Sequence, residues 1–216
     1  TNMKFFKTKL IPFLSVVILF LNTELGLTQD SSRITAGYNS SSTTFSDATS
    51  SVKLDLTGFS LSANIDISDS FVLRGSTGSG KGDLAGISME LNQSSFGFLY
   101  NLTDDLDLEQ GDGSRIGVGF SSVSSDLKTT IGGTTYSTKN QATYIDTTVE
   151  AAYSKSVSFA IGVSGATDNY VPTYILGVRY RLGGGDLMAT YSSFEDQIET
   201  ITAKTTGYSI GYGIRF

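Results

Sequence analysis

The final stretch, 206-TGYSIGYGIRF-216, has the clearest periodicity of the chain. Alternate positions carry large apolar or aromatic side chains, which are Tyr208, Ile210, Tyr212, Ile214 and Phe216. The positions between them carry three glycines, one serine and one arginine. A strict period of two predicts a β-strand. Glycine weakens a strand that faces solvent, whereas a narrow barrel interior needs small residues. The stretch therefore favours a barrel strand whose apolar face points outward.

The same alternation recurs upstream, at residues 33–38, 59–65, 96–102, 115–121, 145–153, 157–164 and 174–182. Tight polar connections are expected near residues 66–70, 103–105, 154–156 and 183–186. Longer connections rich in serine, threonine and glycine are expected at 40–51, 76–84, 122–141, 167–172 and 195–203. The two kinds alternate strictly, which implies ten strands of about 9–14 residues, a length suited to a tilted bilayer crossing. The predicted fold class is all-β, a closed antiparallel up-and-down transmembrane β-barrel of ten strands, with eight as the alternative.

The first 29 residues have a different composition from the rest. Three lysines between Met3 and Leu10 precede the nearly continuous apolar run Leu10–Leu21. That run is too short to span a membrane as a helix and has the length of a secretory signal segment. The sequence therefore predicts upstream residues plus a signal peptide over 1–29, cleaved between Gly26 and Asp30, and a barrel over 30–216. A hairpin is expected to turn around Gly132–Gly133.

Composition excludes several classes of function. The chain has no cysteine and no histidine, so disulfides, thiolate metal sites and histidine-based catalytic groups are absent. Removing residues 1–29 takes three lysines and one glutamate from 15 basic and 21 acidic side chains, which leaves a net charge near −8. This charge argues against a nucleic-acid partner. No serine or carboxylate stands out as a nucleophile, so we expect no enzyme and no cofactor.

The phrases 64-NIDISDSF-71 and 100-YNLTDDLDL-108, the alternating strands and the terminal Phe216 resemble bacterial outer-membrane β-barrels. The chain is similar to the small OmpA, OmpX and opacity-type barrels and to porin-like proteins. The resemblance covers the whole chain after residue 29 and is architectural. It implies a Gram-negative outer-membrane location after export to the periplasm, with outer-membrane lipid as a partner. In that family a terminal phenylalanine with aromatic residues at alternate positions is the signal for the barrel-assembly machinery. Here the matching residues are Tyr208, Ile210, Tyr212, Ile214 and Phe216.

Two motifs suggest binding sites and are rejected on context. The stretch Gly75–Lys81 matches most of a nucleotide-binding loop, but Gly82 replaces the magnesium-binding hydroxyl and a strand rather than a helix follows. We expect a loop between two strands there, and no nucleotide. The acidic segment 104–112 lacks the glycine and the bidentate glutamate of a calcium-binding loop, so it is expected to be a solvated turn.

All six arginines fall by parity on the inward face of the predicted strands. A charge on the lipid face costs about 2–4 kcal/mol at mid-bilayer, which favours this placement. Three carboxylates share the face. The predicted lumen-lining residues are Arg33, Arg74, Arg115, Asp146, Glu150, Arg179, Arg181, Asp186 and Arg215.

Two functions remain open at this point. A polar, arginine-containing lumen would allow porin-like passive diffusion of small, possibly anionic, solutes. Alternatively the arginines pair with acids and close the lumen, leaving a structural or adhesion-type barrel that acts through external loops at 40–51 and 122–141. An exported soluble β-sandwich is a third architecture, but the tyrosine-rich ends of the apolar faces fit a membrane aromatic girdle better.

Overall fold

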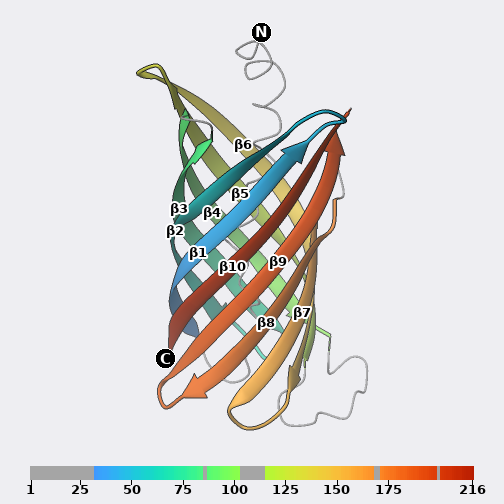
Figure 1. Ribbon diagram of the computed structural model, residues 1–216. Helices are drawn as coiled ribbons and strands as arrows, with labels where there is room; N and C mark the ends of the chain where they lie inside the picture. The colour runs from blue at the N-terminus through green and yellow to red at the C-terminus, as the bar shows by residue number, and fades with distance from the viewer. Residues whose placement is uncertain (1–31, 85–86, 103–114, 168–170, 199) are drawn as a thin grey trace.

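The computed structural model describes residues 32–84, 87–102, 115–167, 171–198 and 200–216, which form ten antiparallel strands (Figure 1). The strands are β1 (Arg33–Ser46), β2 (Ser51–Asp66), β3 (Phe71–Leu84), β4 (Ile87–Asn101), β5 (Arg115–Ile131), β6 (Thr134–Ala152), β7 (Val157–Ala166), β8 (Thr173–Leu182), β9 (Gly185–Ile198) and β10 (Ile201–Arg215). Each strand pairs with its sequence neighbours, and β1 also pairs with β10, so the sheet closes into an up-and-down barrel. The predicted fold class is confirmed with ten strands, and the alternative of eight is wrong.

The two ends of the barrel are distinct. At one end the chain termini of the barrel meet, where the Phe216 N–H donates to the Ser32 carbonyl oxygen at 2.9 Å. We call this the inner end and the opposite one the outer end. The predicted signal peptide, residues 1–29, and the acidic segment 104–112 lie outside the described residues. In the described part of the chain, no helix is long and apolar enough to cross a membrane.

The strands are unequal in length, and this corrects the predicted loops. β7 and β8 have 10 residues each, close to the 9–11 that a tilted crossing needs. β5 has 17 and β6 has 19, so this hairpin rises well above its neighbours at the outer end (Figure 1). Most residues of four of the five predicted long loops are strand instead: 40–46, 76–84, 122–131, 134–141, 195–198 and 201–203. Their serine, threonine and glycine content resembles a loop, but in a closed barrel the two neighbouring strands pair with the backbone regardless of side chain. Of the fifth, 167–172, the described residues 167, 171 and 172 lie outside the strands, as predicted.

The expected turn at Gly132–Gly133 is confirmed. Both residues have positive φ, 56° and 81°, as a two-residue hairpin turn that matches the strand twist requires. Gly183 also has positive φ, 54°, in the inner-end turn between β8 and β9. A side chain other than glycine would be strained at these positions.

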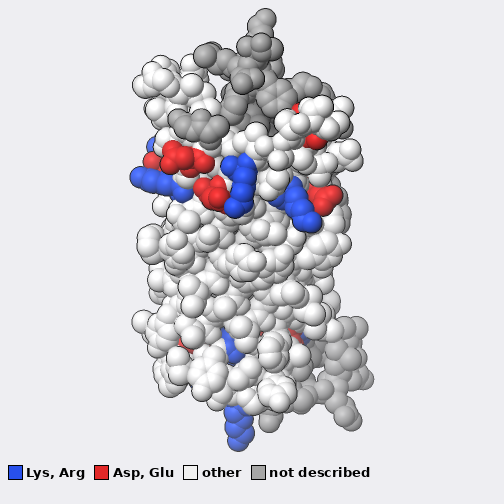
Figure 2. Space-filling model, viewed as in Figure 1, with Lys and Arg blue, Asp and Glu red and all other residues white. Residues whose placement is uncertain are grey.

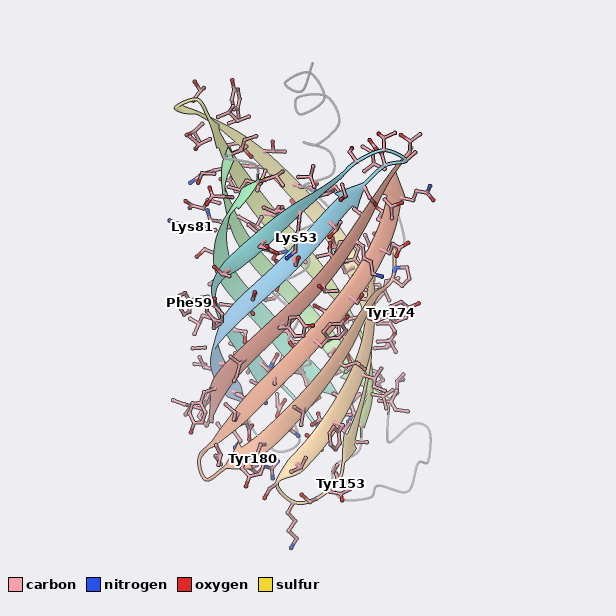
Figure 3. All side chains as sticks on the ribbon, viewed as in Figure 1. Lys53, Phe59, Lys81, Tyr153, Tyr174 and Tyr180 are labelled. Carbon is pink, nitrogen blue, oxygen red and sulfur yellow. The ribbon has the colours of Figure 1, made fainter. Side chains whose placement is uncertain are left out.

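An apolar belt surrounds the inner half of the barrel. Its outward side chains are Ile34, Tyr38, Phe59, Leu61, Ile65, Phe71, Phe96, Phe98, Phe120, Ile145, Val149, Phe159, Ile161, Tyr174, Leu176, Val178, Tyr180, Leu182, Leu187, Tyr208, Ile210, Tyr212 and Ile214. Phe59, Tyr174 and Tyr180 project away from the wall in Figure 3. Edge-on ring pairs join neighbouring strands within the belt, as between Tyr38 and Phe59 with centroids 5.4 Å apart. So large an apolar surface is suited to hydrocarbon rather than water.

The outer half of the wall is polar outside. Exposed charged side chains gather there, and Figure 2 shows them as a band above a broad uncharged zone. They include Lys53, Asp55, Lys81, Asp83, Lys128, Glu195 and Lys204. Lys53 pairs with Asp55 at 3.0 Å, and Lys81 pairs with Glu90 at 3.6 Å. The longer strands therefore continue beyond the belt into a zone suited to water.

The β1–β2 turn at the outer end is held by the side chain of Asp47. Its carboxylate accepts hydrogen bonds from the backbone N–H of Thr49 and of Ser50, each at 2.8 Å. The Thr49 N–H first, and then that of Ser50, hold the pKa of this exposed carboxyl below its ordinary value. A four-residue turn held in this way replaces the long loop expected between residues 40 and 51.

Candidate functional site in the barrel interior

The interior has two zones of opposite character. In the outer half, inward side chains form an apolar core: Phe45, Leu54, Leu56, Leu84, Met89, Leu91, Val123, Leu127, Tyr144, Ile201 and Ala203. None of them is more than 6% exposed. The expectation of a polar lumen is therefore wrong for this half of the barrel. Below the core, toward the inner end, most inward side chains are serine, threonine, asparagine, arginine and carboxylates, with one small apolar cluster formed by Val72 and Leu99.

Asp186 of β9 lies between two arginines at the inner end. Its Oδ2 is 3.3 Å from Arg33 Nη1, and its Oδ1 is 3.6 Å from Arg215 Nε. The side chains of Arg33 and Asp186 are 0% and 1% exposed. Gly213 makes this possible, because a Cβ there would lie 2.5 Å from Arg33 Cδ. The Arg33 side chain therefore crosses the backbone of β10 to reach its partner.

A second buried group joins β6, β7 and β8. The Glu150 carboxylate, in a residue that is 4% exposed, contacts the Arg179 guanidinium and accepts a hydrogen bond from Ser158 Oγ at 2.5 Å. Ser158 Oγ also accepts from Arg179 Nε at 3.1 Å. The three side chains form one connected unit, so both charges in it are compensated.

A third group links β3 to the far wall. Asp146 Oδ2 accepts from Arg74 Nη2 at 2.7 Å and from Ser121 Oγ at 2.9 Å. Its Oδ1 accepts from Ser164 Oγ at 2.6 Å. Arg74 and Asp146 stand on strands that do not neighbour each other, so their 2.7 Å contact spans the interior.

The remaining two arginines of the predicted set lie near these groups by strand register. Arg115 of β5 is directly opposite Glu150, and Arg181 of β8 is directly opposite Asp186. The structure thus brings all three predicted carboxylates against arginines of the predicted set. Whether the nine residues line a path for solutes stays a prediction.

Two small cavities remain in the polar zone. One, of about 70 Å³, is bordered by Asn64, Arg74, Asp146 and a set of serines. The other, of about 40 Å³, is bordered by Glu150, Arg179, Asn39 and Thr35. Asn39 and Asn64 stand among the inward serines and are not among the predicted lumen-lining residues. Both residues lie on the same face of their strands as the inward arginines, and this parity could have predicted their position in the interior.

The predicted assembly signal occupies the outer surface of β10. Its side chains are exposed: Tyr208 62%, Ile210 52%, Tyr212 46%, Ile214 61% and Phe216 68%. These residues belong to or border the apolar belt, and their role in assembly stays a prediction. The nucleotide-loop match lies within β3, not in the loop expected there, and Lys81 points outward to Glu90. Within the described ranges, no group of three or more metal-ligating side chains is present.

No protein-family model matches the chain, and no curated protein matches its sequence. Solved structures match in shape. The translocator domain of autotransporter NalP from Neisseria meningitidis is similar with a TM-score of 0.57 and 10% identity, over 95% of this chain and 96% of that one. The transport unit of the autotransporter AIDA-I from Escherichia coli is similar with a TM-score of 0.51 and 9% identity, over 95% and 96%. The fold of the chain is therefore that of outer-membrane β-barrels, as the sequence predicted.

Proposed function

We propose that this outer-membrane β-barrel has a closed interior and acts through the part of its wall that projects beyond the membrane. The apolar core in the outer half carries the proposal. There the wall is polar outside and apolar inside, the arrangement of a water-soluble barrel, while the inner half has the reverse arrangement. The projecting half has its own core, so it forms a rigid support that presents the long β5–β6 hairpin.

The side chains along the barrel axis support a closed interior. An apolar constriction excludes water, and ions do not cross it without their hydration shells. Below it, the ion pairs Arg33–Asp186 and Arg74–Asp146 occupy part of the polar zone. A barrel of about eight strands is just filled by its own side chains, and ten strands leave only modest extra room. These features support the adhesion-type alternative over free diffusion.

Porin-like passage of small anions is the second candidate. The two polar cavities and the excess of inward arginine over carboxylate favour it. It requires the apolar core to open, since the core lies between these cavities and the outer end.

Planar-bilayer recording of the refolded chain, residues 30–216, separates the two candidates. We expect no discrete conductance steps in KCl, although the protein shows the heat-modifiable mobility of a folded barrel. Met89→Gly with Leu91→Gly removes two inward side chains of the core, so this variant is expected to conduct. Its conductance would also show that the refolded barrel inserts into the bilayer. Wild-type steps with anion preference, reduced by Arg179→Ala with Arg181→Ala, would contradict closure and establish the second candidate.

Single-cysteine labelling tests the projecting wall. The wild-type chain has no cysteine, so every signal reports the introduced residue. Lys128 and Phe120 lie on the same outward face of β5, in the charged band and in the belt respectively. On intact cells, a membrane-impermeant maleimide is expected to label Lys128→Cys and leave Phe120→Cys unlabelled. Equal labelling of the two positions would mean that the membrane surface does not lie between them and would contradict the projecting wall.

A further inference from the structure

Four inward residues with hydrogen-bond donors lie side by side on neighbouring strands. Arg33 of β1 is directly opposite both Arg215 of β10 and Asn64 of β2, and Asn64 is directly opposite Arg74 of β3. All four are inward, so they form a continuous row across four adjacent strands. We call Arg215, Arg33, Asn64 and Arg74 the donor row.

Every member of the donor row has a buried nitrogen without a hydrogen-bond partner. These atoms are Arg33 Nε and Nη2, Asn64 Nδ2, Arg74 Nε and Arg215 Nε. Asn64 is 2% exposed and Arg33 1%, so solvent does not reach them. Buried donors are nearly always satisfied in folded proteins, by the protein or by something bound to it. Arg215 Nε faces Asp186 Oδ1, an acceptor that also has no hydrogen bond, at 3.6 Å, so the other four atoms are the ones that indicate a missing acceptor.

The charge of the row points to the same kind of acceptor. Its three guanidinium groups are matched by two carboxylates, Asp186 and Asp146, and Asp186 is shared between Arg33 and Arg215. Arg33 and Arg215 are also directly opposite each other, and like charges so placed repel. One positive charge is therefore uncompensated in a zone with little solvent, which favours an anion.

Space for a ligand adjoins the row. The cavity of about 70 Å³ is bordered by Asn64, Arg74 and Ser62, whose Oγ also has no hydrogen-bond partner. A cavity of this measure holds about five waters, or one small anion in their place. Asp146 also borders it, but both of its oxygens already accept hydrogen bonds from Arg74, Ser121 and Ser164.

We propose that Asn64 and Arg74, the two members of the donor row that border this cavity, bind a small oxyanion in it, while Arg33 and Arg215 beside them add positive charge. Guanidinium and amide groups donate in pairs to the oxygens of phosphate or carboxylate, and such charge-assisted bonds are the strong ones. The inference stands apart from the proposed function, because it requires neither conduction nor a projecting wall.

Inorganic phosphate is the probe. Thermal unfolding of the refolded chain in a non-ionic detergent is measured in phosphate and in chloride at equal ionic strength. A ligand bound only by the native state raises the unfolding temperature with its concentration, so the midpoint is expected to climb in phosphate alone. Equal midpoints in the two salts would mean that water satisfies the row, and the proposal would be wrong.

Asn64→Asp is the sharpest variant, because it keeps the shape of the side chain and supplies the missing acceptor and charge. It is expected to unfold at a higher temperature without phosphate and to lose the phosphate response. Asn64→Leu removes one donor and is expected to weaken phosphate binding about tenfold with no such gain. Lys53→Gln, which removes an exposed cation of the outer band, is the matched control and is expected to respond as wild type. A phosphate response retained by Asn64→Asp, or lost by Lys53→Gln, would place the anion elsewhere.

Discussion

Replacing Asp186 with alanine is expected to lower the free energy of unfolding by about 3–5 kcal/mol. The side chains of Arg33 and Asp186 are 0% and 1% exposed, so the variant leaves a buried guanidinium without its counter-ion. Arg215 loses the same carboxylate. Most of this cost arises because the Arg33 guanidinium stays buried without a counter-ion. The lost attraction contributes less, because the free energy of removing both charges from water already offsets it in the wild-type pair.

Urea unfolding in lipid vesicles, extrapolated linearly to zero denaturant, measures this effect. Arg33→Met combined with Asp186→Ala removes both charges and is expected to recover a large part of the loss. Asp55→Ala is the matched control, because its pair with Lys53 is about 60% exposed on both sides; an exposed pair contributes about 0–1 kcal/mol. If Asp186→Ala cost no more than Asp55→Ala, the Arg33 side chain would have to be solvated in the membrane.

The second large effect is expected on the lipid face. Leu61 of β2 is 51% exposed within the apolar belt. Leu61→Arg places a charge in hydrocarbon and is expected to destabilise the barrel by about 2–4 kcal/mol at mid-bilayer depth. The same urea titration in vesicles measures it, and the loss is expected to shrink in short-chain lipid, where the charge lies nearer to water.

Gln197→Arg provides the comparison, since Gln197 is exposed on the outer half of β9. A surface substitution of this kind is expected to stay within about 0.5 kcal/mol of wild type. Equal costs for the two variants would mean that the belt and the polar outer wall share one environment, which contradicts the division of the barrel into halves.

Period-two alternation predicted the strands and the inward parity of the arginines, and the alternation of tight and long connections predicted that there are ten strands. Period-two alternation failed where the meaning of the pattern changes along one strand. On β4, Met89 and Leu91 face inward while Phe96 and Phe98 face outward, so the apolar parity switches between them. Alternation alone does not say where the bilayer ends, and that boundary decides which face must be apolar.

The ion pairs and the donor row depend on register, which the sequence does not contain. Arg33 reaches Asp186 across 153 residues, and it faces Asn64 only because β1 and β2 align with one particular offset. A shift of the pairing by one residue would have turned every side chain to the other face. Parity therefore identified which charged residues share the interior, but not which of them meet.

The switch in apolar parity also fixes how deep the molecule sits. A barrel that is apolar outside over its full height can slide along the bilayer normal at little cost. Here sinking would draw Lys53 and Lys81 into hydrocarbon, and rising would bring Phe59 and Leu61 into water. When membrane thickness differs from the height of the belt, the lipid must stretch or compress around the protein, because the protein cannot change its level.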